Sequence, residues 1–104
     1  MDVFVAPSLQ DACADGLVNC TPLGMIGYGG NAFKDVQLTG RKWICDAVYT
    51  PIETAFLKDG EAAGVEILSG YELFLYQGIH AFQLFTGRQV DPAALRRMLA
   101  MART

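Results

Sequence analysis

Three short apolar runs of the sequence end in polar or glycine residues whose types could do chemistry. Residues 19–25 close the first run, residues 47–51 the second, and Ser69 and Gly70 the third. If the runs are strands of one parallel sheet, their carboxyl ends meet at the edge where open α/β sheets bind ligands. A helix that begins at Ser69 and Gly70 would add free backbone N–H groups and a positive dipole end. This arrangement favours an anionic or nucleotide ligand.

Gln77 and His80 lie on the helix expected after Gly70, and they share a stripe with Leu73 at helical spacing. An amide in so apolar a helix must find a hydrogen-bond partner or face solvent. Gln77 is therefore either a ligand contact or a satisfied buried amide, and the argument for a structural role is stronger still for His80.

The cysteines and the single histidine form no recognisable metal or redox motif. The number of cysteines is odd, and no two of Cys13, Cys20 and Cys45 have the short spacing of a zinc or redox motif. His80 has no cysteine or acidic partner at ligand spacing. We therefore predict no metal site and no cysteine nucleophile. We expect the thiols to be small buried apolar groups in a reducing cytoplasm.

The elements that would position these residues alternate between strands and helices. Strands are predicted at residues 16–20, 43–49 and 65–68, where short apolar runs fit a buried parallel sheet. A strand-like run at residues 3–5 and a short helix at residues 8–15 precede them. The alternation from residue 16 onward predicts an α/β fold with a parallel sheet.

Capping signals predict three further helices. Thr50 suits the N-cap of the first, with Pro51 at the first helical position, and Gly64 is placed to end it. A long apolar helix follows Ser69 and ends near Gly87, and the last helix begins at Asp91-Pro92 and ends near Ala102.

Composition excludes several classes of protein. Eight Lys and Arg against eleven Asp and Glu give a net charge of −3, which offers no basic surface for nucleic acid. The sequence shows no signal peptide and no run of roughly 20 apolar residues for a membrane span. With 104 residues, 52 % of them apolar, we expect residues 1–104 to form a single cytoplasmic domain with its own core.

Three stretches carry a resemblance to a known family. Residues 14–25, residues 46–54 with the pattern Asp-x-x-Tyr-x-Pro-x-x-Thr, and Gly70 with residues 77–87 resemble shikimate/quinate dehydrogenases in order and spacing. The likeness extends from about Ala14 to Asp91 and looks closest to the quinate/shikimate branch. It implies the C-terminal portion of an NAD(P)-binding domain, with a partial doubly wound (Rossmann-like) parallel sheet and flanking and C-terminal helices.

The resemblance also implies roles for individual residues. Tyr49 and Gln77 would contact the ring hydroxyls or carboxylate of shikimate or quinate. The reaction would be reversible hydride transfer between NADP or NAD and a ring carbon that bears an alcohol or ketone. Tyr49, Gly70 and Gln77 must then meet at one rim of the sheet. The residues implied for the cofactor are Asn19, Cys20, Thr21, Ala47, Gly70 and Leu73.

Two positions depart from the family pattern. Leu73 stands where methionine is usual, a change that keeps the volume and is tolerable. Glu72 stands where a small residue is common, so it puts a carboxylate near the cofactor entrance. We favour a helix-capping role for Glu72 together with Ser69.

The glycine-rich stretch at residues 27–30 suggests a dinucleotide-binding loop, with Asp46 about 20 residues further on. Such a loop must leave a strand directly and open a helix. Residues 21–25 intervene before it, and residues 31–34 begin no convincing helix, so we interpret the match as accidental. The long loop at residues 23–40 is nevertheless of the kind that is usually functional.

The resemblance places the family's glycine-rich loop and its catalytic Lys and Asp pair upstream of every matching motif. Lys34, Lys42 and Lys58 lie in none of these motifs, so we predict no catalytic residue in this chain and no turnover by the chain alone. The expected partner is a second copy or a complementing N-terminal fragment. The alternatives are a non-catalytic, self-associating α/β half-domain and a small-molecule binding module.

Overall fold

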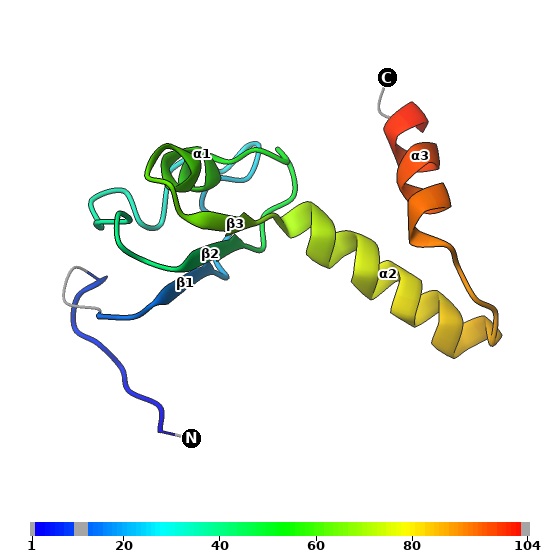
Figure 1. Ribbon diagram of the computed structural model, residues 1–104, viewed down its shortest axis with the longest axis horizontal. Coiled ribbons are helices and arrows are strands. Elements are labelled where there is room, and N and C mark those ends of the chain that lie inside the picture. Colours follow the sequence, from blue (N-terminus) through cyan, green and yellow to red (C-terminus); the bar gives the residue numbers. More distant parts are fainter. Residues whose placement is uncertain (1, 10–12, 103–104) are drawn as a thin grey trace. The chain divides into compact units, whose positions relative to one another are not determined.

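Three parallel strands form the centre of the first of two compact units in the computed structural model, which describes residues 2–9 and 13–102. β1 (Gly16–Asn19), β2 (Trp43–Asp46) and β3 (Glu66–Leu68) lie in the order β1-β2-β3 (Figure 1). Both strand pairs are parallel, which confirms the predicted α/β sheet. The first unit ends at Gly70, and the second begins at Tyr71.

The register of the strands determines which residues lie side by side on neighbouring strands. Leu17 pairs with Ile44, and Ile44 pairs with Ile67. Because side chains alternate between the two faces of a strand, these three lie on the same face. Asn19 pairs with Asp46 at the carboxyl ends of β1 and β2, so two polar side chains also meet there.

Helix α1 (Ala55–Ala62) covers the face of the sheet that carries Ile44. Phe56 and Leu57 of this helix are buried. A Cβ on Gly60, also in the helix, would stand 2.2 Å from Cδ1 of Ile44. Gly60 therefore lets the helix approach the strand more closely than any larger residue would. Gly64, with φ at 76°, follows the helix as predicted.

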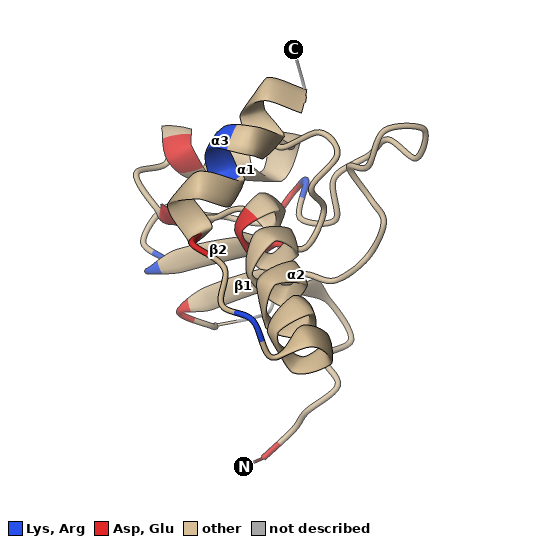
Figure 2. Cartoon of the chain, turned by 90° about the vertical axis from the view of Figure 1, so that its right-hand side faces the viewer, with Lys and Arg blue, Asp and Glu red and all other residues tan. Residues whose placement is uncertain are grey.

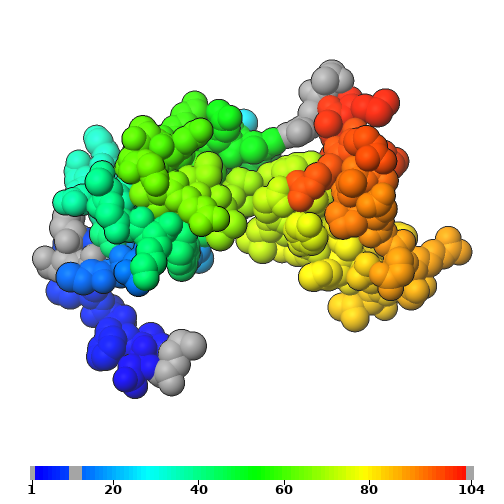
Figure 3. All heavy atoms as spheres, in the orientation of Figure 1, coloured from blue at the N-terminus to red at the C-terminus, as the bar shows by residue number. Residues whose placement is uncertain are grey.

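The connection between β1 and β2 completes the cover of this face without a helix. Phe33 stacks on Phe56 with ring centroids 4.7 Å apart, and Val36 and Leu38 are also buried. Asn31 Nδ2 donates to Asp59 of α1 at 3.2 Å. Figure 3 shows this connection and α1 as neighbouring surfaces. The long loop is thus a packing segment, a role that its glycine content concealed.

The start of α1 differs from the prediction. The N-cap is Thr54, whose hydroxyl accepts a hydrogen bond from the Leu57 N–H at 3.3 Å, and the peptide bond between Thr50 and Pro51 is cis. The predicted cap at Thr50 is therefore wrong. Thr50 and Thr54 could each supply a capping hydroxyl. Thr54 is the one whose hydroxyl also donates a hydrogen bond to the buried Asp46.

The second unit contains two helices. α2 begins at the unit boundary and spans Gly70–Thr86, and α3 spans Pro92–Ala102, so both predicted helices are confirmed. Asp91 Oδ1 accepts a hydrogen bond from the Ala93 N–H at 3.1 Å and caps α3. Glu72 is the only Asp, Glu, Lys or Arg in α2, which Figure 2 shows as a helix almost without charge.

The N-terminal residues do not match the prediction. Val3, Phe4 and Val5 are between 84 % and 97 % exposed and form no strand, so the strand-like reading of this run is wrong. Among the described residues, no strand pairs with this run. The helix predicted from Ser8 falls partly on residues 10–12, which lie outside the described residues, and residues 13–15 are not helical.

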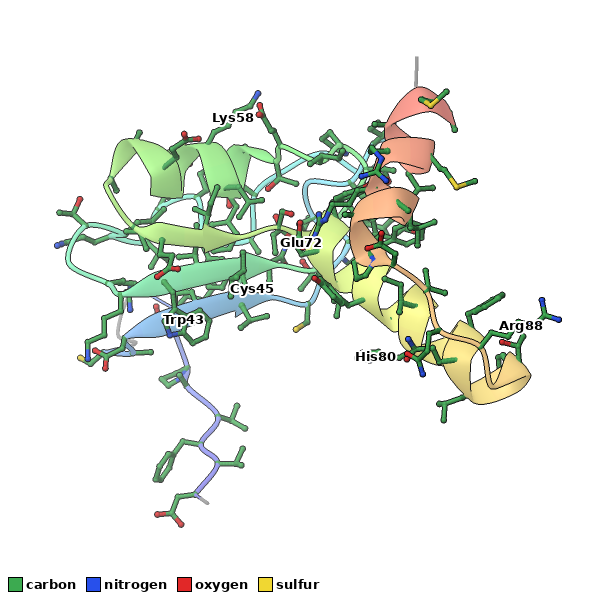
Figure 4. All side chains as sticks on the ribbon, turned by 45° about the vertical axis from the view of Figure 1, so that its right-hand side comes forward. Trp43, Cys45, Lys58, Glu72, His80 and Arg88 are labelled. Atoms are coloured by element: carbon green, nitrogen blue, oxygen red, sulfur yellow. The ribbon has the colours of Figure 1, made fainter. Side chains whose placement is uncertain are left out.

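The sheet face opposite α1 stays half open. Val18, Trp43 and Leu68 are 45 %, 38 % and 49 % exposed. Figure 4 shows Trp43 and Cys45 on this face, with Lys58 pointing outward from α1 on the other side. The first unit therefore presents an apolar surface formed by alternate residues of all three strands.

Candidate functional site

A pocket of about 230 Å³ opens where β1 and β2 end. Four of its residues, Cys20, Thr21, Ala47 and Tyr49, are among those that the resemblance implies for cofactor or substrate. None of the lining residues carries a charged side chain. The lining residues are Cys20, Thr21, Pro22, Met25, Ala47, Val48, Tyr49 and Thr50.

Asn19, also implied for the cofactor, does not line this pocket and is only 2 % exposed. Its Nδ2 donates to the Leu23 carbonyl at 3.0 Å and to Asp46 Oδ1 at 3.1 Å. Its Oδ1 accepts from the N–H and the hydroxyl of Thr21, at 3.0 and 2.6 Å. The Asn19 side chain therefore supports the wall that contains Thr21, and both of its polar atoms are committed.

Asp46 is fully buried and accepts three hydrogen bonds. Its Oδ1 accepts from Asn19 Nδ2 and from the Val48 N–H at 3.0 Å, and its Oδ2 accepts from the Thr54 hydroxyl at 2.6 Å. Within the described residues, every buried side-chain polar atom has a hydrogen-bond partner. Asp46 thus joins the segments that follow β1, follow β2 and precede α1.

Gly70 is held against the same region of the first unit. A Cβ at this position would stand 2.3 Å from the carbonyl oxygen of Val48 and 2.7 Å from that of Ala47. The resemblance implies Gly70 for the cofactor, and its close neighbour in the structure is the chain's own backbone. The absence of a side chain is required by the meeting of the β2 end with the start of α2.

Leu73 and Gln77 belong to the second unit. Leu73 is 50 % exposed, and Gln77 is also exposed, so the reading of Gln77 as a buried amide is wrong. Gln77 lines a groove of about 490 Å³ that is otherwise apolar or glycine. The groove residues are Phe74, Leu75, Gln77, Gly78, Ile79, Phe82, Val90, Leu95 and Leu99.

Glu72 forms an ion pair within the second unit rather than the predicted cap. Its two carboxylate oxygens accept hydrogen bonds from Arg96 at 2.5 and 2.6 Å. This hydrogen bonding lowers the pKa of Glu72 below that of an ordinary glutamate. The Arg96 guanidinium also lies 5.9 Å from the centre of the Tyr76 ring. The two-pronged geometry of arginine explains why it outcompetes the backbone for this carboxylate.

The cysteines are less buried than expected. Cys13 and Cys20 are exposed and Cys45 is partly exposed, because the sheet face that carries Cys45 is half open. Burial, followed by the charge of Asp46 and the neighbouring Cys20, raises the pKa of the Cys45 thiol. A raised pKa disfavours the thiolate, so Cys45 is poorly suited to act as a nucleophile.

Two kinds of site were also sought in the described part of the chain. In residues 2–9 and 13–102, no three His, Cys, Asp or Glu side chains are grouped so that they could hold a metal ion. Among the helices of these same residues, none has the length and apolar character needed to cross a membrane.

The roles of Asp46 and Thr54 were not recognised from the sequence, although both belong to the quoted motif. One signal was present. Asp46 ends an otherwise apolar strand, and a carboxylate in such a position must be paired or hydrogen-bonded. Its partners come from residues 27 positions before it and 8 positions after it, and spacing alone does not identify them.

Comparison with known proteins supports the resemblance. Residues 70–99 match the family described as Shikimate 5'-dehydrogenase C-terminal domain. The chain is 46 % identical over 85 residues to quinate/shikimate dehydrogenase (NAD(+)) of Corynebacterium efficiens, covering 82 % of this chain and 30 % of the relative. It is 40 % identical over 83 residues to shikimate dehydrogenase (NADP(+)) of an Arthrobacter species, covering 80 % and 28 %. The chain therefore spans about a third of the length of these relatives.

The fold is also similar to that of solved structures. Quinate dehydrogenase from Corynebacterium glutamicum, in complex with NAD, matches with a TM-score of 0.75 and 40 % identity. The match covers 86 % of this chain and 32 % of that one. The neighbours confirm the Rossmann-like character of the parallel sheet. Sequence and fold together show that the chain belongs to the shikimate/quinate dehydrogenase family.

Proposed function

We propose that this chain forms one wall of the active site of an NAD(P)-dependent oxidoreductase that acts on shikimate or quinate. The observation that carries the proposal is the pocket at the ends of β1 and β2, which gathers Cys20, Thr21, Ala47 and Tyr49 from two strand ends. The named activities of the relatives supply the class of substrate and cofactor.

The pocket fits the nicotinamide end of the cofactor better than its phosphates. Its uncharged lining offers no cation and no helix start for a pyrophosphate, whereas a flat amide-bearing ring needs apolar walls and a few hydrogen-bond groups. Bound NAD or NADP would supply or accept the hydride. In this proposal Thr21 and Ala47 position the ring, with Asn19, Cys20, Gly70 and Leu73 as the other implied cofactor residues.

Tyr49 and Gln77 are the proposed substrate contacts. Tyr49 lines the pocket and is 43 % exposed, and in this proposal its hydroxyl bonds a ring hydroxyl or carboxylate. The exposed amide of Gln77 would donate or accept a second bond from α2. Neither group removes or supplies the proton, since the catalytic pair implied by the family has no counterpart here. The 104 residues purified by themselves should therefore show no dehydrogenase turnover.

A chimera tests the proposed function. The matching third of the Corynebacterium glutamicum quinate dehydrogenase is replaced by residues 14–99 of this chain, and NAD reduction is measured with quinate and with shikimate. We expect activity, and we expect Tyr49→Phe to raise KM while Tyr28→Phe, at a position outside the pocket, leaves it unchanged. A folded chimera that turns over neither substrate would contradict the proposal, as would equal effects of the two substitutions.

We also propose that residues 1–104 act as one domain, located in the cytoplasm. A length of 104 residues suits one domain. The free thiols of Cys20 and Cys45 suit a reducing compartment.

Self-association is the second candidate function, and the half-open sheet face favours it. Val18, Trp43 and Leu68 form an apolar surface, and β1 pairs only with β2 in the described part of the chain. Edge pairing with a second copy, or with a complementing N-terminal fragment, would cover both. Sedimentation should show a dimer or larger assembly that Trp43→Lys reduces to a monomer. A monomeric wild-type chain of normal stability would contradict this candidate.

A small-molecule binding module is the third reading, and it differs in predicting saturable binding by the chain alone. Titration with NAD, NADP, shikimate and quinate, followed through the amide resonances of Thr21 and Tyr49, separates the cases. Saturation by one of the four supports a binding module. Silence from all four favours the self-associating half-domain.

A further inference from the structure

The Asp46 carboxylate is the point at which the two walls of the pocket are connected. One wall contains Thr21, whose hydroxyl donates a hydrogen bond to Asn19. The Asn19 amide in turn donates a hydrogen bond to Asp46. The other wall begins at Val48, whose N–H donates directly to Asp46, and Tyr49 follows it in the chain. Asp46 itself is fully buried and does not line the pocket.

The chemistry of the partners favours a carboxylate at this position. Asn19 Nδ2, the Val48 N–H and the Thr54 hydroxyl all donate, and together they engage both oxygens of Asp46. The Thr54 oxygen already accepts from the Leu57 N–H, so its own proton is available to Asp46. An asparagine with its amide nitrogen toward Asn19 and Val48 would face two donors, and with the nitrogen toward Thr54 it would turn that hydroxyl from donor to acceptor. Charge-assisted bonds to a carboxylate are also stronger than neutral ones.

We propose that Asp46 is a positioning residue that holds the Thr21 wall and the Tyr49 wall in a fixed relation. It acts through Asn19 and Val48 and touches neither ligand. The inference rests on the proposed function for the ligands involved, but the coupling between the walls is a property of this chain by itself. Disturbing one wall should therefore be detected at the other.

The primary experiment is made on the 104-residue chain with ¹H–¹⁵N amide spectra. Thr21→Val keeps the side-chain shape but removes the hydroxyl that bonds Asn19, and Thr21 is exposed, so stability should hardly change. We expect the amide resonances of Val48 and Tyr49 to shift, because the Val48 N–H joins their wall to Asp46. Asp59→Asn, an exposed change on α1 that keeps the shape of a side chain bonded to Asn31, is the control and should leave both resonances in place.

The second variant, Asp46→Asn, tests the carboxylate itself. We expect the Thr21 and Tyr49 amides to shift together and to exchange faster with solvent. If this variant fails to fold, the Thr21→Val result still decides the matter. Unchanged Val48 and Tyr49 resonances in Thr21→Val, or shifts confined to residues 46–48 in a folded Asp46→Asn, would overturn the proposal.

Ligand titration separates the two proposals. Where wild type binds shikimate or quinate, a folded Asp46→Asn chain should bind about tenfold more weakly, because misplaced contact groups make weaker hydrogen bonds and a loss of about 1.4 kcal/mol is tenfold in affinity. Coupled amide shifts without any wild-type binding would sustain the positioning role and count against ligand binding by the chain. Unchanged affinity in Asp46→Asn with uncoupled walls would reject the positioning role and leave the proposed function intact.

Discussion

The α-carbon of Gly70 lies against the carbonyl group of Val48, so closely that a Cβ there would stand 2.3 Å from the oxygen. The contact joins the start of α2 to the segment that follows β2. Both partners are backbone atoms, so no rotation of a side chain relieves the crowding. The glycine in this motif is therefore explained by the packing of two strand ends, before any ligand is considered.

Gly70→Ala should accordingly destabilise the chain. Overpacking a close contact costs about 1–3 kcal/mol, and urea denaturation followed by Trp43 fluorescence measures it. Gly78→Ala in the same helix is the matched control, because a Cβ at Gly78 would meet nothing within 4 Å. That change should stabilise by about 0.5–1 kcal/mol through helix propensity. Equal effects at the two positions would show that the Val48 contact is not the cause.

Strands and helix ends could be predicted because their signals are local. The apolar runs that contain Leu17 and Ile44 can be recognised from neighbouring residues alone. The same holds for Gly64, the glycine that follows α1. The start of α1 could not be predicted, because Thr50 and Thr54 both suit a cap and the choice rests on a bond to Asp46 across the fold. The packing of Phe33 against Phe56 depends in the same way on tertiary structure.

The candidate site shows the same division. The family motifs identified Thr21 and Tyr49, which line one pocket. They did not show that Asn19 turns its side chain away from that pocket, toward Asp46. Glu72 was interpreted locally as a cap, whereas its partner Arg96 lies 24 residues away. Side chains whose partners are distant in sequence are the ones that sequence patterns misplace.

Thr54→Val should destabilise the chain by about 1–3 kcal/mol. The substitution removes the acceptor of the Leu57 N–H and the donor to Asp46 together, while it keeps the shape. Thr50→Val is the control, because Thr50 is exposed and does not cap α1. Thermal or urea unfolding of both variants distinguishes the caps, and a larger loss at Thr50 would contradict the structure.

Phe33→Ala should unfold or strongly destabilise the first unit. Truncation of a buried phenylalanine costs about 3–5 kcal/mol, and the cavity would open directly above Phe56. Tyr28→Ala in the same loop removes a ring that is 62 % exposed, so its effect should stay within about 0.5 kcal/mol. If both substitutions are tolerated equally, the loop does not have the packing role described above.

The Glu72 and Arg96 pair predicts a specific acid response. Because hydrogen bonding lowers the pKa of Glu72 in the folded chain, the pair stabilises fully above the pKa of an unfolded glutamate, about 4.3. That stabilisation is lost as the pH falls through the lower, folded pKa. Carboxyl ¹³C titration of Glu72 should show the depressed pKa, and Arg96→Gln should return it to the ordinary range. Arg97→Gln, which replaces an exposed arginine of α3, should leave it depressed.

The proposed single domain predicts that both units unfold together. Trp43 is the only tryptophan of the chain and reports on the first unit, while the Leu75 amide reports on the second. If residues 1–104 form one cooperative domain, unfolding of the first unit also unfolds α2. The two urea midpoints should coincide, and Phe33→Ala should lower both by the same amount. A Leu75 transition that stays in place while the Trp43 transition moves would show two independent units and reject the single domain.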